Sequence, residues 1–326
     1  PRGLTPPSGA RRTPELLCVD ARNLLWIIFP MQNIGNTIAE KFGKGRTVFS
    51  VEFFPPKTEE GARQILRTAN RLKKVRPDFV SITYGAGGSS RERTLEYGEL
   101  LGEIFGFEVM PHLACYGHSK SEIASILERF DSAGFRNVMA LRGDKPKDGS
   151  VSAHPDGFAH ADELVGFVRE KFPHFGIGCA GYPEKHPEAP DMRADIANLK
   201  RKVDAGADFV TTQLFFDNSH YFRFVEMCRG AGIDKPIVAG LLPALSLKQL
   251  ANFKAMCSTD VPRALSERLE AAGESPDAQA AAGLEWAQEQ IDELLEAKVP
   301  GIHLYILNRA ESALKLSEKF GGRGER

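Results

Sequence analysis

From residue 48 onward, short apolar runs alternate with longer segments of helical periodicity, and this alternation predicts repeated strand and helix units. The apolar runs are rich in β-branched residues and are short enough to be buried parallel strands. The predicted strands are residues 48–54, 79–85, 109–115, 137–142, 176–182, 209–216, 236–242 and 301–307. A segment with the spacing of a helix follows each of these strands.

The first helical segment, residues 58–74, has one apolar stripe and one charged face. Ala62, Ile65 and Ala69 lie on the stripe, opposite Arg63 and Arg67, as expected of a helix that covers a sheet. The comparable segments are residues 91–105, 120–133, 161–172, 192–205, 220–231, 247–256 and 310–320. Eight alternating pairs predict an α/β fold of the (β/α)₈ TIM-barrel class.

The interval between residues 256 and 301 interrupts this rhythm. It has room for two more helices, 262–272 and 276–297. We interpret them as an insertion before the eighth strand, because the interval contains no strands of its own and no clear linker. We therefore predict one barrel domain, residues 47–326.

Residues 1–46 are predicted to form an N-terminal arm that is partly disordered. The first thirty residues are rich in Pro and Arg and begin without an initiator Met. We hypothesise that Met31 is the natural start. The intact mass of the protein from its native cell would test this, and a mature chain that begins well before Met31 would contradict it.

Composition excludes several classes of function. The chain of 326 residues carries 42 basic and 43 acidic residues, and a net charge of -1 does not support binding to nucleic acid or to a membrane surface. The longest apolar run, residues 24–30, is too short to span a bilayer. The five cysteines are scattered without a close pair, which predicts neither a disulfide framework nor a metal site and fits a cytoplasmic protein.

One carboxylate, Glu52, lies inside the otherwise apolar strand 48–54, which Pro55 and Pro56 end. Loss of hydration favours the protonated form of a carboxyl, so a buried Glu52 could hold and deliver a proton at neutral pH. The alternative is that Glu52 faces solvent or pairs with an Arg of a neighbouring strand. The strand by itself does not decide between these two interpretations.

In a barrel of this class the active site lies where the strands end at their carboxyl side. Nearly every predicted strand has a polar residue there, and together they indicate a site. They are Glu52, Thr83, Tyr84, His112, Arg142, Asp144, Tyr182, Gln213, Tyr305, Asn308 and Arg309.

Alternatives stay open for individual residues in this set. His112 could be a core histidine with one hydrogen bond, and Arg142 could hold a polar ligand or pair with Asp144. The glycine-rich turn 85–88 lets the backbone approach a ligand but lacks the spacing of a phosphate-binding loop. The helix 192–205 carries a polar stripe that is either a solvated surface or a contact for phosphates and hydroxyls at the barrel mouth; it consists of Asp195, Asn198, Arg201 and Lys202.

Six motifs between residues 47 and 320 resemble those of the methylenetetrahydrofolate reductase family. They are EFFPPKT at 52–58, VSITYGA at 80–86, ALRGD at 140–144, YPEKHPE at 182–188, LKRKVDAGA at 199–207 and LNRA at 307–310. The resemblance implies an oxidoreductase of one-carbon metabolism that supplies methionine biosynthesis. In this family FAD carries a hydride from NADH or NADPH to 5,10-methylenetetrahydrofolate and gives 5-methyltetrahydrofolate in a ping-pong cycle.

The resemblance also assigns roles to residues. Glu52 would be the general acid that protonates the leaving nitrogen of the folate, and the charge of Asp144 would favour the iminium cation that forms. Contacts to FAD are implied for Thr83, Tyr84, Ala86, His112, Arg142, Gly143, Asp144, Tyr182, His186, Asp195, Asn198, Arg201 and Lys202. His160 aligns with a Tyr that many relatives place beside the flavin. The folate and nicotinamide contacts would be Glu52, Gln213, Gln249, Phe253, Tyr305 and Arg309, the last at the glutamate tail.

Other functions remain open at this stage. The same reaction could draw electrons from a partner flavoprotein or iron-sulfur protein. The barrel could bind flavin or folate without turnover, or it could be a phosphate-binding isomerase or lyase. We expect a homo-oligomer, and we expect no inhibition by S-adenosylmethionine, because the sequence ends near residue 326, before the regulatory domain of animal relatives.

Overall fold

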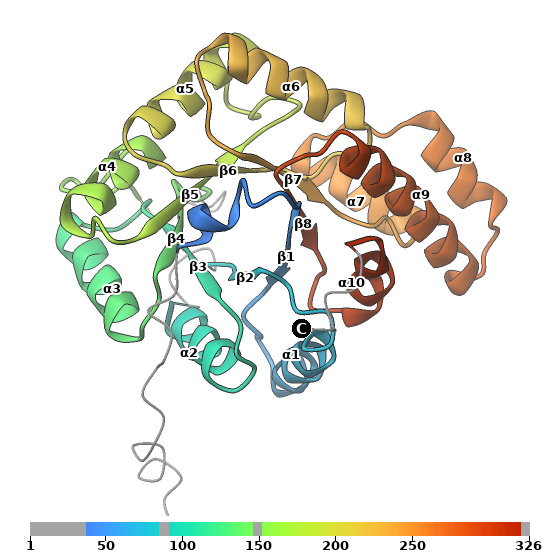
Figure 1. Ribbon diagram of the computed structural model, residues 1–326, viewed down its shortest axis with the longest axis horizontal. Coiled ribbons are helices and arrows are strands. Elements are labelled where there is room, and N and C mark those ends of the chain that lie inside the picture. The colour runs from blue at the N-terminus through green and yellow to red at the C-terminus, as the bar shows by residue number, and fades with distance from the viewer. Residues whose placement is uncertain (1–36, 85–90, 146–151, 321–326) are drawn as a thin grey trace, which may run out of the picture. The chain divides into compact units, whose positions relative to one another are not determined.

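The computed structural model describes residues 37–84, 91–145 and 152–320. In these residues eight parallel strands close into a barrel, each strand pairing with the next and β8 pairing with β1. Helices surround the barrel on the outside (Figure 1). The predicted (β/α)₈ fold is confirmed. The proposed start at Met31 and the glycine-rich turn 85–88 lie outside the described residues.

The strands begin within one residue of their predicted starts. They are β1 Val48–Phe53, β2 Phe79–Ile82, β3 Val109–Ala114, β4 Asn137–Leu141, β5 Gly176–Gly181, β6 Phe209–Thr212, β7 Ile237–Leu241 and β8 Gly301–Tyr305. Each ends earlier than the sequence pattern indicated. The polar residues that follow leave the strand pairing and enter the loops at the carboxyl end.

The outer helices also match the periodic segments. They are α1 Glu59–Leu72, α2 Arg91–Glu103, α3 Lys120–Ser132, α4 Ala161–Lys171, α5 Met192–Asp204, α6 Asn218–Gly230, α7 Leu247–Cys257 and α10 Ala310–Ser317. Short polar side chains cap several of their N-termini. Ser119 forms a full capping box with Glu122 at the start of α3, and Asp191 accepts a hydrogen bond from the backbone of Ala194 at the start of α5.

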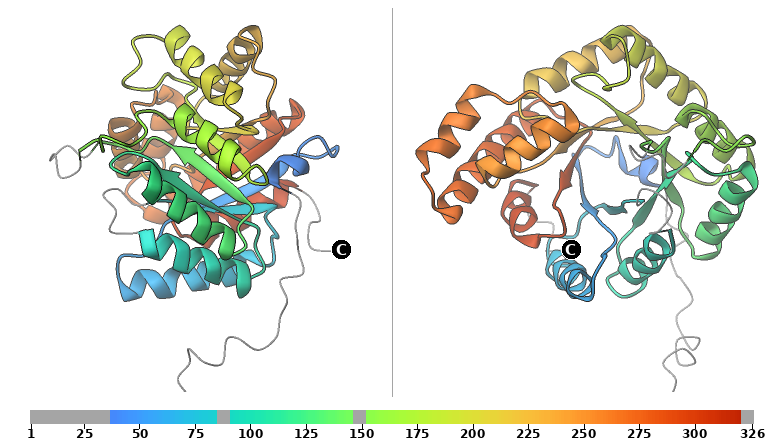
Figure 2. Two further views of the ribbon diagram at one scale, coloured as in Figure 1. Left: turned by 90° about the vertical axis from the view of Figure 1, so that its left-hand side faces the viewer. Right: turned by 180° about the vertical axis from the view of Figure 1, so that it is seen from behind.

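The two inserted helices are present as predicted, α8 Arg263–Ala271 and α9 Pro276–Glu296. They stand beside α7 on one flank of the barrel (Figure 2). Leu250, Leu265 and Leu269 form an apolar cluster there, with Trp286 packed against it. The insertion is therefore an extension of the barrel wall around its own small core.

The interior of the barrel has an apolar end and a polar end. Alternate residues of a strand face opposite sides of the sheet, so Phe49, Val51 and Phe53 of β1 pack toward the helices while Val48 joins the interior cluster. That cluster closes the N-terminal end of the barrel and consists of Ile38, Val48, Phe79, Met110, Met139, Phe209 and Val238. Further along the strands the interior positions become polar, and the site lies there.

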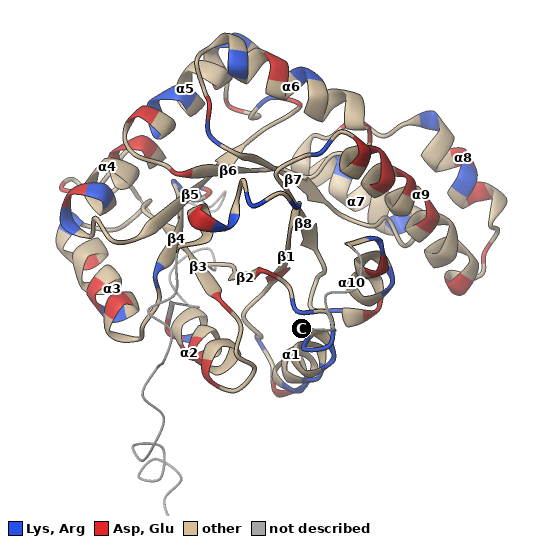
Figure 3. Ribbon diagram, in the orientation of Figure 1, with Lys and Arg blue, Asp and Glu red and all other residues tan. Residues whose placement is uncertain are grey.

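Neither the distribution of surface charge nor the cysteines indicate a functional site. Basic and acidic residues alternate along the outer helices (Figure 3). The described cysteines, Cys115, Cys179, Cys228 and Cys257, are free thiols. Of the helices described, none combines the length and the apolar character that crossing a bilayer requires.

Candidate active site

A cavity of about 710 Å³ lies at the carboxyl end of the barrel strands, within the range of roughly 300–1,000 Å³ that small-molecule and cofactor sites occupy. Most of the predicted site residues line it. They are Glu52, Thr83, Tyr84, His112, Arg142, Gly143, Asp144, His160, Tyr182, His186, Asp195, Asn198, Arg201, Lys202, Gln213 and Tyr305. The structure thus brings these side chains together, while their individual roles stay predictions.

Three predicted substrate residues lie outside the cavity lining. Gln249 and Phe253 are on α7, where Gln249 Oε1 accepts a hydrogen bond of 2.8 Å from the backbone of Leu245. Phe253 packs against the apolar cluster of the inserted helices, and Arg309 is exposed at the start of α10. Ala86 lies outside the described residues.

Asn308, another residue at a strand end, has a structural role. Its side chain accepts a hydrogen bond from the backbone N–H of Phe54 and donates one to the Phe54 carbonyl, both at 2.8 Å. This pairing ties the loop after β8 to the end of β1. The hydrogen bonds account for Asn308 without a ligand.

Glu52 is buried, with 6% of its surface exposed, and faces the cavity from β1. Its Oε2 atom lies 3.5 Å from His112 Nε2 and 3.9 Å from His303 Nε2. Within the described residues no Arg forms an ion pair with this carboxyl. The alternative of a solvent-facing or Arg-paired Glu52 is therefore wrong.

His112 faces the same space from β3. Burial lowers its pKa, and the Glu52 carboxylate opposes that shift. Within the described part of the chain, His112 Nε2 and Thr211 Oγ1 are buried atoms without a hydrogen-bond partner. Since buried polar groups are nearly always satisfied, two such atoms on the wall of one cavity indicate a polar ligand.

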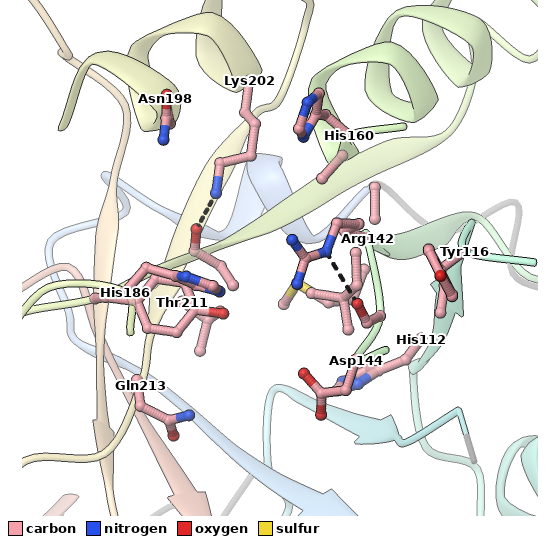
Figure 4. A pocket seen from close by; sticks show the side chains of 18 of the residues that line it. His112, Tyr116, Arg142, Asp144, His160, His186, Asn198, Lys202, Thr211 and Gln213 are labelled. Atoms are coloured by element: carbon pink, nitrogen blue, oxygen red, sulfur yellow. Dashed lines mark hydrogen bonds between the residues drawn. The ribbon is translucent and has the colours of Figure 1, made fainter. Parts of the chain in front are cut away.

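Arg142 pairs with a residue that sequence reasoning missed. It donates two hydrogen bonds to the Glu188 carboxylate, at 2.5 and 2.8 Å. This hydrogen bonding lowers the pKa of Glu188 to about 2. The alternative in which Arg142 pairs with Asp144 is not what the structure has. Asp144 and Gln213 instead point into the pocket (Figure 4).

The polar stripe of α5 is a wall of the cavity, not only a solvated surface. Asp195 is buried and accepts a hydrogen bond of 3.0 Å from the backbone of His186, which fixes the loop after β5. Arg201 donates to Asn198 at 2.8 Å, and Lys202 donates to the Ala180 carbonyl at 2.5 Å. Two cations thus lie at one rim, where they can receive an anionic ligand.

Sequence reasoning missed a second layer of polar residues below the strand ends. Ser50, Ser81, Thr211 and His303 are buried, and each precedes a predicted site residue by two positions. Because the side-chain period of a strand is two, these residues face the same interior. Counting back two residues from Glu52, Thr83, Gln213 and Tyr305 would have found them. The lining residues Tyr116, His118 and Glu188 come from loops, and Asp162 lies in the first turn of α4; none of the four follows the two-residue period of a strand.

The amino-acid sequence matches the family described as methylenetetrahydrofolate reductase over residues 37–321. This chain belongs to the methylenetetrahydrofolate reductase family. It is 36% identical over 280 residues to 5,10-methylenetetrahydrofolate reductase of Escherichia coli (strain K12), covering 86% of this chain and 93% of that protein. It is 39% identical over 290 residues to "Methylenetetrahydrofolate reductase (NADH) 1" of Arabidopsis thaliana, covering 85% of this chain and 49% of that protein.

The chain spans about half the length of the plant members of the methylenetetrahydrofolate reductase family that it matches. A solved structure of an uncharacterized protein from Clostridium thermocellum, described as binding two copies of 5-methyl-5,6,7,8-tetrahydrofolic acid, is similar in fold. The TM-score is 0.61 at 15% identity, and the match covers 84% of this chain and 93% of that one. At this identity the likeness concerns the barrel alone.

Proposed function

We propose that this protein reduces 5,10-methylenetetrahydrofolate to 5-methyltetrahydrofolate, with FAD as cofactor and NADH or NADPH as hydride donor. The observation that carries the proposal is Glu52, a buried carboxyl on the wall of the cavity at the carboxyl end of the barrel. Family membership supports the reaction, and the names of the plant relatives support NADH as donor for those proteins.

The residues of the cavity fit FAD. His112 Nε2 and Thr211 Oγ1 are buried polar atoms without a hydrogen-bond partner among the described residues, so a ligand with polar groups would satisfy them. We propose that Arg201 and Lys202 hold the pyrophosphate at the rim. The flavin and ribityl contacts would come from Thr83, Tyr84, His112, Arg142, Gly143, Asp144, His160, Tyr182, His186, Asp195 and Asn198. When bound, FAD would supply a carrier that takes a hydride from the nicotinamide and passes it to the folate carbon.

The side chains of this protein would supply the proton chemistry. Opening the imidazolidine ring of the folate breaks a C–N bond, and the electron pair of that bond goes to the nitrogen. We propose that Glu52 donates the proton that this nitrogen needs. The carboxylate of Asp144 would favour the cationic iminium carbon that results.

Gln213, which lines the cavity, is the proposed contact for the folate ring. Phe253 lies outside the lining but packs against the same apolar cluster as Tyr305, which lines the cavity. We propose that Gln249, Phe253 and Arg309 contact the parts of the folate or nicotinamide that extend beyond the cavity.

Anaerobic absorption spectroscopy of the purified chain tests the proposal. We expect flavin absorption bands that bleach on addition of NADH or NADPH and return when 5,10-methylenetetrahydrofolate is added. One 5-methyltetrahydrofolate should form for each flavin that is reoxidised. If neither nicotinamide bleaches the flavin but chemically reduced protein still reduces the folate, the donor is a partner protein. A protein that takes up no flavin, or that reduces no folate with any reductant, overturns the proposal.

A further inference from the structure

We propose that Glu184 is a positioning residue for α7: it binds the chain that follows α7 and thereby holds Phe253 and Gln249 in place for the substrates. This inference rests on the proposed function, which assigns substrate contacts to Phe253 and Gln249. Glu184 and its side-chain partner Thr259 lie outside the cavity lining, so both would act through α7 and not by contact with a ligand.

Two hydrogen bonds join Glu184 to the chain that follows α7. Thr259 Oγ1 donates to Glu184 Oε1 at 2.6 Å, and the backbone N–H of Asp260 donates to Glu184 Oε2. Ser258 ends α7 in the left-handed backbone conformation, at φ 53°, so the two residues after it leave the helix and can donate to the carboxylate. Because Thr259 is only 4% exposed, its hydroxyl depends on the protein for a hydrogen-bond partner.

The loop after β5, which carries Glu184, is itself held in place by side chains from other elements. Asp195 of α5 accepts a hydrogen bond of 3.0 Å from the backbone of His186. Arg142, which follows β4, donates two hydrogen bonds to Glu188. Both contacts lie within four residues of Glu184 along the chain. The carboxylate therefore extends from a fixed loop and can hold an element that is less firmly packed.

The helix α7 is such an element. The structure describes all of its residues, and Leu250 is the one that is buried, whereas α1 and α6 bury four residues each. At its N-terminal end the backbone of Leu247 donates a hydrogen bond of 3.1 Å to Gln279 of α9. Because a helix with few buried contacts gains little stability from packing, the orientation of α7 depends on the contacts at its two ends. Glu184 supplies the contact at the C-terminal end.

The C-terminal end of α7 lies beside the cavity. Cys257, the last residue of α7, packs against the same apolar cluster as Phe253 and Tyr305, and Tyr305 lines the cavity. Burial raises the pKa of the Cys257 thiol, and the carboxylate of Asp144, which points into the cavity (Figure 4), raises it further. Phe253 precedes Cys257 by one helical turn. A displacement of this end of α7 would therefore move Phe253 relative to the cavity.

Glu184→Ala and Thr259→Val test the inference. The two half-reactions of the holoenzyme are followed separately by anaerobic rapid mixing at increasing concentrations of the nicotinamide and of 5,10-methylenetetrahydrofolate. In Glu184→Ala we expect both half-saturating concentrations to rise on the order of tenfold, the usual effect of losing a hydrogen bond to a charged group. Thr259→Val keeps the backbone hydrogen bond and should show a smaller rise. Limiting rates and FAD content should stay at the wild-type level, because the reacting groups are unchanged.

A conservative variant, a control and a measurement without turnover separate positioning from folding. Thr259→Ser keeps the hydroxyl donor and should retain the wild-type half-saturating concentrations. Glu267→Ala removes a carboxylate that pairs with Arg263 within α8 and should change none of these quantities. Hydrogen–deuterium exchange of the holoenzyme should be faster in residues 247–257 of Glu184→Ala than of the wild type, and equal in α3. Thermal unfolding is measured for each variant.

The outcomes distinguish this inference from the function on which it rests. If the wild-type protein carries out no folate half-reaction, the proposed function fails, and this inference fails with it. If the wild type is active and folded Glu184→Ala leaves the half-saturating concentrations or the exchange of α7 unchanged, the inference alone is overturned. Loss of FAD from Glu184→Ala also overturns it, because the residue would then act on the flavin loop. Should Glu184→Ala not fold, the comparison of Thr259→Val with Thr259→Ser decides.

Discussion

The surroundings of Glu52 illustrate how a residue acquires a role from neighbours that are distant in the chain. Its carboxyl meets one imidazole from β3 and another from β8, and both approach the same oxygen. This carboxyl is shielded from water, and in the part of the chain that the structure describes it forms no ion pair with Lys or Arg. Such surroundings suit a group that has to release a proton and regain it in each cycle.

Replacing Glu52 with Gln should separate the two half-reactions. Folate reduction should fall by a factor of about 10²–10⁴, the usual contribution of a general acid, while FAD content and reduction by NADH stay intact. Rapid mixing measures both rates. Glu274→Gln, an exposed change between α8 and α9, is the control. Loss of both half-reactions together would contradict the assigned role.

The pair of Arg142 and Glu188 predicts a dependence of stability on pH. The pKa of Glu188 is lowered from 4.5 to about 2, chiefly by its hydrogen bonds from Arg142. The pair therefore stabilises the fold fully above pH 4.5, and this contribution is lost as pH falls toward 2. The side chain of Glu188 is 52% exposed. Glu188→Gln should therefore lower the free energy of unfolding by no more than about 1 kcal/mol at pH 7.

Urea unfolding of the wild type and Glu188→Gln between pH 7 and pH 3 measures this contribution. The difference in free energy of unfolding between the wild type and Glu188→Gln should decrease progressively below pH 4.5. A difference that is independent of pH would show that the variant acts through lost packing and not through the ion pair.

At the scale of elements, the helices differ in how closely they approach the barrel. Trp286 of α9 donates a hydrogen bond of 3.0 Å to the Phe216 carbonyl after β6, and Gly283 of the same helix lies against the loop after β7. A Cβ at Gly283 would lie 1.7 Å from the Ala244 carbonyl oxygen. The inserted helix can therefore pack this closely only with glycine at that position.

Matched Gly→Ala substitutions in two helices should have opposite effects on the free energy of unfolding. Gly283→Ala should lower the free energy of unfolding by at least about 2 kcal/mol, because α9 must move away from the backbone of Ala244. Gly166→Ala in α4, where nothing lies within 4 Å of the new Cβ, should stabilise by about 0.5–1 kcal/mol. Thermal and urea unfolding measure both, and equal effects would contradict the packing assigned to α9.

The helix α5 should hold the anionic part of the cofactor. Arg201→Ala removes a cation from the cavity rim and should weaken FAD retention by roughly tenfold, since charge-assisted hydrogen bonds are among the strong ones. Arg193→Ala, an exposed change on the same helix outside the cavity lining, is the matched control. Equilibrium dialysis with FAD measures the affinity. Unchanged affinity in Arg201→Ala would count against the pyrophosphate contact.

At the scale of the whole molecule, the apolar cluster and the candidate active site lie at opposite ends of the barrel. The apolar cluster closes the N-terminal end, where the short helix η1, Ile38–Lys41, lies across the opening (Figure 1). Ile38 is fully buried there, and its backbone N–H donates a hydrogen bond of 2.8 Å to Asn137 Oδ1. Substitutions at this end should change stability and leave the site at the other end intact.

Ile38→Ala tests this separation. It should lower the free energy of unfolding by about 2–5 kcal/mol, because a buried aliphatic side chain leaves a cavity. Ile104→Ala, at a side chain that is 55% exposed, should change it by less than about 1 kcal/mol. Urea unfolding measures both. Both variants should reduce folate at the wild-type rate per folded molecule. A lower rate per folded molecule in Ile38→Ala would show that the two ends of the barrel are not independent.

The order and the approximate bounds of the strands and helices follow from the sequence alone, because they depend on local periodicity. The residues at the strand ends could be named for the same reason, since parallel strands must present their carboxyl ends at one face of the barrel. The position of Glu52 in this set therefore needed no structure. Only the structure shows that Glu52 lies close to His112 and His303.

Tertiary structure alone decided how distant residues meet. Ser50 and His303 are 253 positions apart, and they pair because the barrel closes β8 onto β1. Arg142 meets Glu188 through a loop whose path no periodicity describes, and α7 holds Phe253 away from the cavity wall by packing against an inserted helix pair. Local patterns fix which face a residue occupies, whereas contacts between elements depend on closure and loop paths, which are properties of the whole chain.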